Sequence, residues 1–94
     1  MIDTFSYNGK VLKADPPVEV VCFGHAKNKK YYRAAIPSIH VVVVEKTEHV
    51  AILNLNRKLV CKWNEYAFTD NDELDENGTG IKRNLLAFLK DVTP

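Results

Sequence analysis

Hydrophobic and polar residues alternate through the first two thirds of the chain, and their spacing then changes to that of a helix. Up to Phe68, short apolar stretches separated by turn residues recur about every ten residues. Such spacing is typical of an antiparallel sheet or a small barrel. The pattern therefore predicts an α+β fold, mainly β, in which six to seven short strands over about residues 4–68 are packed by one C-terminal helix.

The first predicted hairpin has the clearest local signal. Residues 4–7 and 10–13 flank Asn8-Gly9, the dipeptide best suited to the positive backbone angles of a two-residue turn. Residues 39–44, which include four consecutive valines, predict a central strand covered on both faces, because an uninterrupted β-branched run suits a fully buried strand. The remaining strands are predicted at 18–23, 31–36, 50–55 and 59–68.

The last of these strands is expected to have one buried and one wet face. Leu59, Cys61 and Trp63 fall on one side of an extended chain, and Lys62 falls on the other. Cys61, like Cys22, is then expected to be a small buried hydrophobic residue. Two cysteines do not make the framework of a small secreted domain, although a disulfide bond across paired strands stays open.

The C-terminal segment has the period of an amphipathic helix. Apolar residues recur there with the spacing i, i+4, i+7 and i+11, at Ile81, Leu85, Phe88 and Val92. This pattern predicts a helix over about residues 79–92, with Thr79 as its N-cap, after an acidic loop at 69–78.

Length and composition indicate one domain over residues 1–94. With 46% hydrophobic and 27% charged residues, the chain resembles an ordinary globular protein. No apolar run approaches the roughly 20 residues that span a bilayer, and the first residues lack a secretory pattern. We therefore expect no membrane partner and a cytoplasmic protein, in the host cytoplasm if it is viral; the composition also fits a regulator from a virus or accessory element.

Charge is distributed unevenly. Residues 1–66 hold ten Lys/Arg and six Asp/Glu, whereas residues 67–94 hold three and six, so the two parts carry +4 and −3. This asymmetry is compatible with one basic and one acidic face, but it falls short of the basic patch of a dedicated duplex-DNA binder.

The acidic part gives the first candidate binding surface. Acidic groups steer a partner toward a surface, and aromatic residues are enriched among the side chains that hold a complex together. A solvated loop that caps the helix is the alternative reading. The candidate partner-binding residues are Tyr66, Phe68, Asp70, Asp72, Glu73 and Asp75.

The basic part gives the second candidate. Segment 27–33 interleaves cations with aromatic rings, as single-stranded nucleic-acid binders do, because cations follow phosphates and rings stack on bases. The alternative reading is a solvated hairpin tip with half-buried tyrosines. The candidate nucleic-acid-binding residues are Lys27, Lys29, Lys30, Tyr32 and Arg33.

Metal and catalytic motifs are weak. Cys22, His25 and Cys61, with His40 or His49, supply zinc-ligand types, but they lack the two close pairs of a structural site. A small enzyme or ligand carrier built on Cys22, His25 and His40 is the least supported reading, because nothing in the sequence marks a reactive thiol. We expect no metal, cofactor or catalytic residue.

Residues 75–80 resemble the opening of a calcium loop, with oxygen-bearing side chains at Asp75, Asn77 and Thr79 followed by Gly80. The resemblance fails further on, since Leu86 occupies the position of the bidentate glutamate. An acidic loop that caps the helix explains the segment better.

These observations favour a small non-enzymatic binding protein, a regulator or inhibitor that occupies a surface of a partner protein. A domain this short uses most of its apolar residues in its core and has little left for a deep pocket. A rigid face of ~800 Å² is enough for a standard protein interface. The alternative is a single-stranded nucleic-acid-binding module, and self-association stays open.

Overall fold

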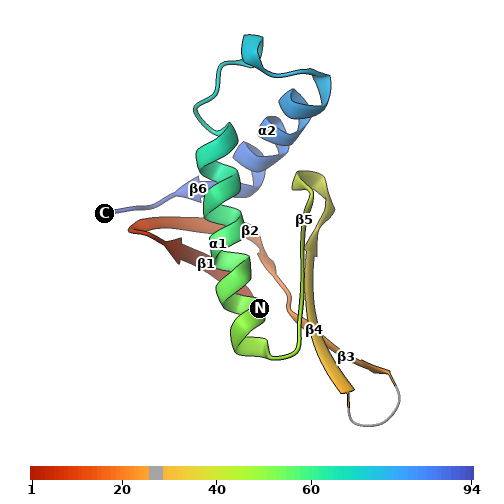
Figure 1. The fold of residues 1–94 in the computed structure, drawn as a ribbon. Coiled ribbons are helices and arrows are strands. Elements are labelled where there is room, and N and C mark those ends of the chain that lie inside the picture. The colour runs from red at the N-terminus through yellow and green to blue at the C-terminus, as the bar shows by residue number, and fades with distance from the viewer. Residues whose placement is uncertain (26–28) are drawn as a thin grey trace.

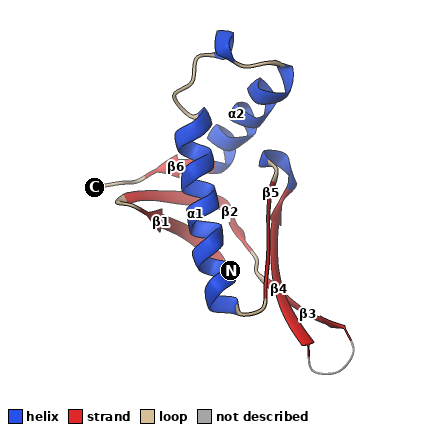
Figure 2. Cartoon of the chain, in the orientation of Figure 1, coloured by secondary structure: helices blue, strands red, loops and turns tan. Residues whose placement is uncertain are grey.

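The computed structural model of the protein describes residues 1–25 and 29–94, which form two small antiparallel sheets and two α-helices (Figure 1 and Figure 2). In the described part, extents of 50 × 32 × 21 Å show an elongated shape. Two single-turn 3-10 helices, η1 (Pro37–Ile39) and η2 (Asn71–Glu73), precede β5 and α2. The other elements are β1 (Ile2–Tyr7), β2 (Lys10–Val18), β3 (Val21–His25), β4 (Lys29–Ile36), β5 (Val41–Glu45), α1 (Glu48–Tyr66), α2 (Glu76–Phe88) and β6 (Leu89–Asp91).

The first sheet has the strand order β1-β2-β6. Its hairpin turns at Asn8 and Gly9, whose φ angles of 50° and 82° confirm the turn predicted from the sequence. Phe5 lies opposite Leu12 in the register, and both side chains are fully buried. The C-terminal β6 pairs with the other side of β2, so the last strand closes the sheet that the first strands began.

The second sheet has the strand order β3-β4-β5, and α1 lies between the two sheets (Figure 2). The sheet turns Ala34, Ile36, Val41 and Val43 toward the helix, and all four are buried. The helix contributes five buried side chains, so one core joins both sheets through α1. These side chains are Ala51, Leu55, Leu59, Val60 and Trp63.

The strands predicted at 50–55 and 59–68 are wrong, because residues 48–66 form α1. Ala51, Leu55, Leu59 and Trp63 follow one another at intervals of four, which places them on one helical face. The hydroxyl of Thr47 accepts a hydrogen bond from the Val50 amide at 3.2 Å and caps the helix. The short segment at 59–63 also fits an alternating strand, and only the longer window identifies the helix.

The prediction of a central strand at 39–44 is also wrong, since Ile39 belongs to η1 and the strand β5 begins at Val41. Among the described strands, β5 pairs with β4 alone, so it is an edge strand. Val41 and Val43 are buried against α1, whereas Val42 and Val44 are exposed. A run of valines shows no alternation of polar and apolar residues, so the sequence does not indicate that one face of the strand is exposed.

The C-terminal helix is confirmed, but it begins and ends earlier than predicted. Asp75 rather than Thr79 is its N-cap, since the Asp75 carboxylate accepts a hydrogen bond from the Gly78 amide at 2.7 Å. The helix ends at Phe88, and the chain continues into β6, so Val92 lies beyond the helix. Ile81 and Leu85 are buried as expected.

Both cysteines contradict the expectation that they are buried, since Cys22 on β3 and Cys61 on α1 are exposed free thiols. Cys61 is two residues from both Leu59 and Trp63, so in a helix it points to the opposite side. The α+β class, with six antiparallel strands and a C-terminal helix in the described part, is confirmed. The described residues form two separate sheets and two helices, instead of one sheet or barrel with one helix.

Candidate functional site

The face of the β3-β4-β5 sheet that points away from α1 is apolar and exposed. On the two edge strands, Val21, Val42 and Val44 keep 49%, 46% and 47% of their surface exposed. Valine is among the residues most often buried, so three half-exposed valines on one face make it a candidate interaction surface. We call this surface the outer face, and it comprises Val21, Phe23, Tyr31, Arg33, Ala35, Val42 and Val44.

The strand register organises the outer face around one cation. Val21 on β3 and Val44 on β5 are both direct register partners of Arg33, whose exposed side chain lies between them. Phe23 and Tyr31 are register partners in the next row on this face, and their rings stack with centroids 5.7 Å apart and planes at 27°. The outer face therefore offers aliphatic, aromatic and guanidinium groups to a partner.

A shallow groove of about 420 Å³ adjoins the outer face where β2 passes the second sheet. The residues that line it include Pro16 and Pro17 of β2, Val21 and Arg33 of the outer face, and Phe88 at the end of α2. Residues of the outer face and of the C-terminal helix therefore line the same groove.

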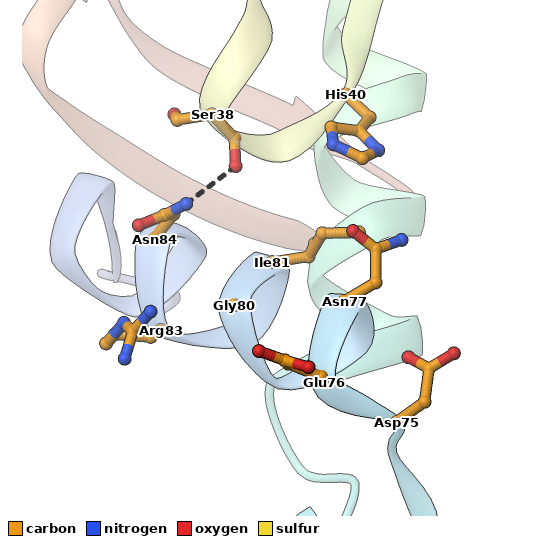
Figure 3. Close-up of a pocket in the computed structure, with 9 residues that line it drawn as sticks. All are labelled: Ser38, His40, Asp75, Glu76, Asn77, Gly80, Ile81, Arg83 and Asn84. Atoms are coloured by element: carbon orange, nitrogen blue, oxygen red, sulfur yellow. Dashed lines mark hydrogen bonds between the residues drawn. The ribbon is translucent and has the colours of Figure 1, made fainter.

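A second, polar cavity of about 640 Å³ lies where η1 meets the start of α2 (Figure 3). The Asn84 amide donates a hydrogen bond to the Ser38 carbonyl at 2.9 Å across it. His40, whose φ angle of 57° is left-handed, lines the cavity together with Glu76 and Arg83. Its charges are mixed and open to solvent, so the cavity favours no single class of ligand.

The acidic residues that the sequence nominates lie together on the connector between α1 and α2, at one end of the molecule (Figure 1). Asp70, Asp72, Glu73 and Asp75 are all exposed there. Lys82 donates to the Thr69 carbonyl at 2.6 Å and fastens the connector to α2. Asp75 serves as the cap of α2, so its carboxylate is already engaged in the fold.

The two aromatic residues of this candidate surface differ in their surroundings. Phe68 is 75% exposed, and its ring meets Trp63 edge-on at 6.3 Å. Tyr66 is half-buried against the core, and the Lys62 ammonium lies 5.5 Å from its ring centroid. Burial, followed by the negative charge of Glu65, raises the pKa of Tyr66. Phe68 is therefore the more accessible of the two.

The residues nominated for nucleic-acid binding are divided between two faces of β4. Lys27 and the Lys29 side chain lie outside the described part, and Lys30 is exposed. Arg33 belongs to the outer face, whereas Tyr32 belongs to the opposite face, beside Cys22. The hydrogen bond and charge of Cys22 raise the pKa of Tyr32. Tyr32 and Arg33 therefore do not form one stacking platform.

The candidate zinc ligands are spread over three parts of the fold. Cys22 and His25 belong to β3, His49 and Cys61 belong to α1, and His40 follows η1. Across residues 1–25 and 29–94, apart from the side chains at 25 and 29, no three His, Cys, Asp or Glu side chains are grouped to hold a metal ion.

Sequence reasoning missed Val21, Val42 and Val44 as surface residues. Hydrophobicity alone suggested burial at all three. The sequence offers no signal for Val42 and Val44, because a run of five residues starting at Val41 is too short to show whether one face of the strand or both are covered.

Neither helix in the described part is both long and apolar enough to cross a membrane. No family model, curated protein or solved structure matches this chain.

Proposed function

We propose that the protein is a small non-enzymatic binding protein, a regulator or inhibitor, which acts by occupying a surface of a partner protein through its outer face. The observation that carries this proposal is the row Val21, Arg33 and Val44, in which two half-exposed valines flank an exposed arginine on paired strands. Apolar area of this kind is stabilised when a partner covers it.

The composition of the outer face supports the proposal. Arg and aromatic residues are enriched among the few side chains that dominate binding energy. Arg33 is surrounded by valine and, further along β4, by Tyr31, so a partner would exclude water around the guanidinium. A partner with an apolar patch around a carboxylate would complement this arrangement.

The rigid setting of the outer face is a second support. Val42 and Val44 alternate with Val41 and Val43, which are fixed in the core against α1. A preorganised face loses little conformational entropy on binding, and more of the contact energy then appears as affinity.

The test is capture of a partner by the tagged protein from a lysate of its source, followed by surface plasmon resonance. Val21→Asp should weaken the complex at least about tenfold, because it puts a charge in a desolvated contact. Val92→Asp is the matched control, since Val92 is 39% exposed but lies outside the outer face. Equal affinities for both variants and the parent would contradict binding through this face.

The acidic connector is tested in the same assay. Asp72→Asn with Glu73→Gln removes two exposed charges from the connector. If the connector also contacts the partner, the double variant should associate more slowly and with a weaker salt dependence. An unchanged association rate would restrict binding to the outer face.

A further inference from the structure

We propose that two copies of this chain associate by pairing their β5 strands antiparallel, which would join two three-stranded sheets into one. Within the described residues, β5 bonds to β4 along one edge and has no strand along the other. An exposed edge of β-branched residues is a template for another strand. This proposal concerns the edge of the sheet and stands apart from partner binding on the outer face.

A hydrogen bond indicates which backbone groups face the free edge. The Lys58 ammonium donates to the Val42 carbonyl at 2.9 Å. In an antiparallel ladder, the amide and carbonyl of one residue point to the same side, and the direction alternates along the strand. Val42 and, two residues further on, Val44 therefore turn their backbone groups outward.

This arrangement is self-complementary. With a twofold axis at Val43, Val42 of one copy faces Val44 of the partner subunit, and the outward amides and carbonyls of both residues find partners reciprocally. Their side chains are both half-exposed, so the pairing brings apolar groups together on the outer side of the joined sheet. No charged residue lies between Val41 and Val44, so no like charges oppose one another there.

The same geometry indicates a weak dimer. Five paired residues span only ~17 Å of strand. The contact area of such a short strand pair is smaller than the ~800 Å² per partner of a standard interface. Lys58 on α1 must also release the Val42 carbonyl, and a charged side chain placed over a strand edge opposes pairing with another strand. We therefore infer that Lys58 keeps association reversible and dependent on concentration.

The test uses the purified protein alone, by sedimentation velocity from about 5 µM to about 500 µM, a range that covers weak interfaces. The parent should shift from monomer to dimer. Val44→Lys should raise the dissociation constant at least about tenfold, and Lys58→Gln should lower it at least about threefold. Val21→Lys is the matched control, because Val21 has the same exposure and the same face but belongs to the other edge strand.

Hydrogen exchange can be measured on the parent protein, so the result does not depend on whether a variant folds. The amides of Val42 and Val44 should exchange more slowly at high than at low protein concentration, whereas the exchange rates of the β3 amides should not change. A protein that stays monomeric in both the parent and Lys58→Gln would overturn the proposal. So would equal weakening by Val21→Lys and Val44→Lys, because the contact would then be the outer face rather than the edge.

Discussion

The Lys10 ammonium lies 2.9 Å from the Asp91 carboxylate and joins β2 to β6, although 81 positions separate the two residues. The Thr93 amide donates to the same carboxylate at 2.9 Å, and the Val11 amide donates to the Thr93 hydroxyl at 2.9 Å. Hydrogen bonds from Thr93, followed by that from Lys10, lower the pKa of Asp91 to about 2. The C-terminus is therefore fastened to the N-terminal sheet by a network centred on one carboxylate.

The first prediction is that this network makes the stability of the fold depend on pH in the acidic range. Because folding lowers the pKa of Asp91 from 3.8 to about 2, the stability that its carboxylate contributes is complete above the ordinary pKa and is lost as pH falls through the lower value. The parent should melt above Asp91→Asn at neutral pH, and the gap should shrink between about pH 4 and pH 2. Melting curves by circular dichroism measure it. A gap that stays constant across this window would show that Asp91 is not held by the network.

The second prediction tests whether residues 50–55 are helical, as in the structure, or form the strand that the local sequence pattern suggests. Leu53 and Leu55 would share one face of a strand, but in α1 Leu53 is 54% exposed and Leu55 is fully buried. Leu55→Ala should cost about 2–5 kcal/mol of unfolding free energy, and Leu53→Ala less than about 0.5 kcal/mol. Urea denaturation compares the two variants. Similar losses would favour the strand.

Local turn chemistry and helical period could be predicted from the sequence, because each depends on neighbours in the chain. Asn8-Gly9 identifies a turn by its backbone preference alone, and Ile81 and Leu85 identify a buried helix face by their spacing. The acidic loop predicted at 69–78 could likewise be identified by its charges, which disfavour burial, although α2 already begins at Glu76.

Features that depend on distant packing could not be predicted. Whether Val42 is covered depends on what lies across the sheet, and a valine run is compatible with either outcome. The spacing of Leu59, Cys61 and Trp63 predicts a buried cysteine in a strand, whereas the helix that the tertiary fold stabilises turns Cys61 outward. The outer face escaped prediction for the same reason, since its residue types are those of a core.

The third prediction concerns the start of α2. Asp75 accepts from the Gly78 amide at 2.7 Å, so Asp75→Ala should cost about 0.5–2 kcal/mol of unfolding free energy. Asp75→Asn keeps an accepting oxygen and should cost much less. Thr79→Ala is the control for the alternative cap suggested by the sequence and should have a smaller effect than Asp75→Ala. Thermal melts would contradict this assignment if Thr79→Ala were the more damaging change.

The last prediction uses Trp63, the only tryptophan in the chain, to report on the acidic connector. Trp63 is 6% exposed, and the Phe68 ring meets it edge-on at 6.3 Å. Phe68→Ala should open the indole to water and shift its emission to longer wavelength, while the melting temperature falls little because Phe68 itself is 75% exposed. Leu86→Ala removes another exposed apolar side chain, 47% exposed and not in ring contact with Trp63, and should leave the emission unchanged. If the two variants have the same emission spectrum, Phe68 does not cover Trp63 in solution. A shift confined to Phe68→Ala would instead make Trp63 a direct probe of any partner that contacts the connector.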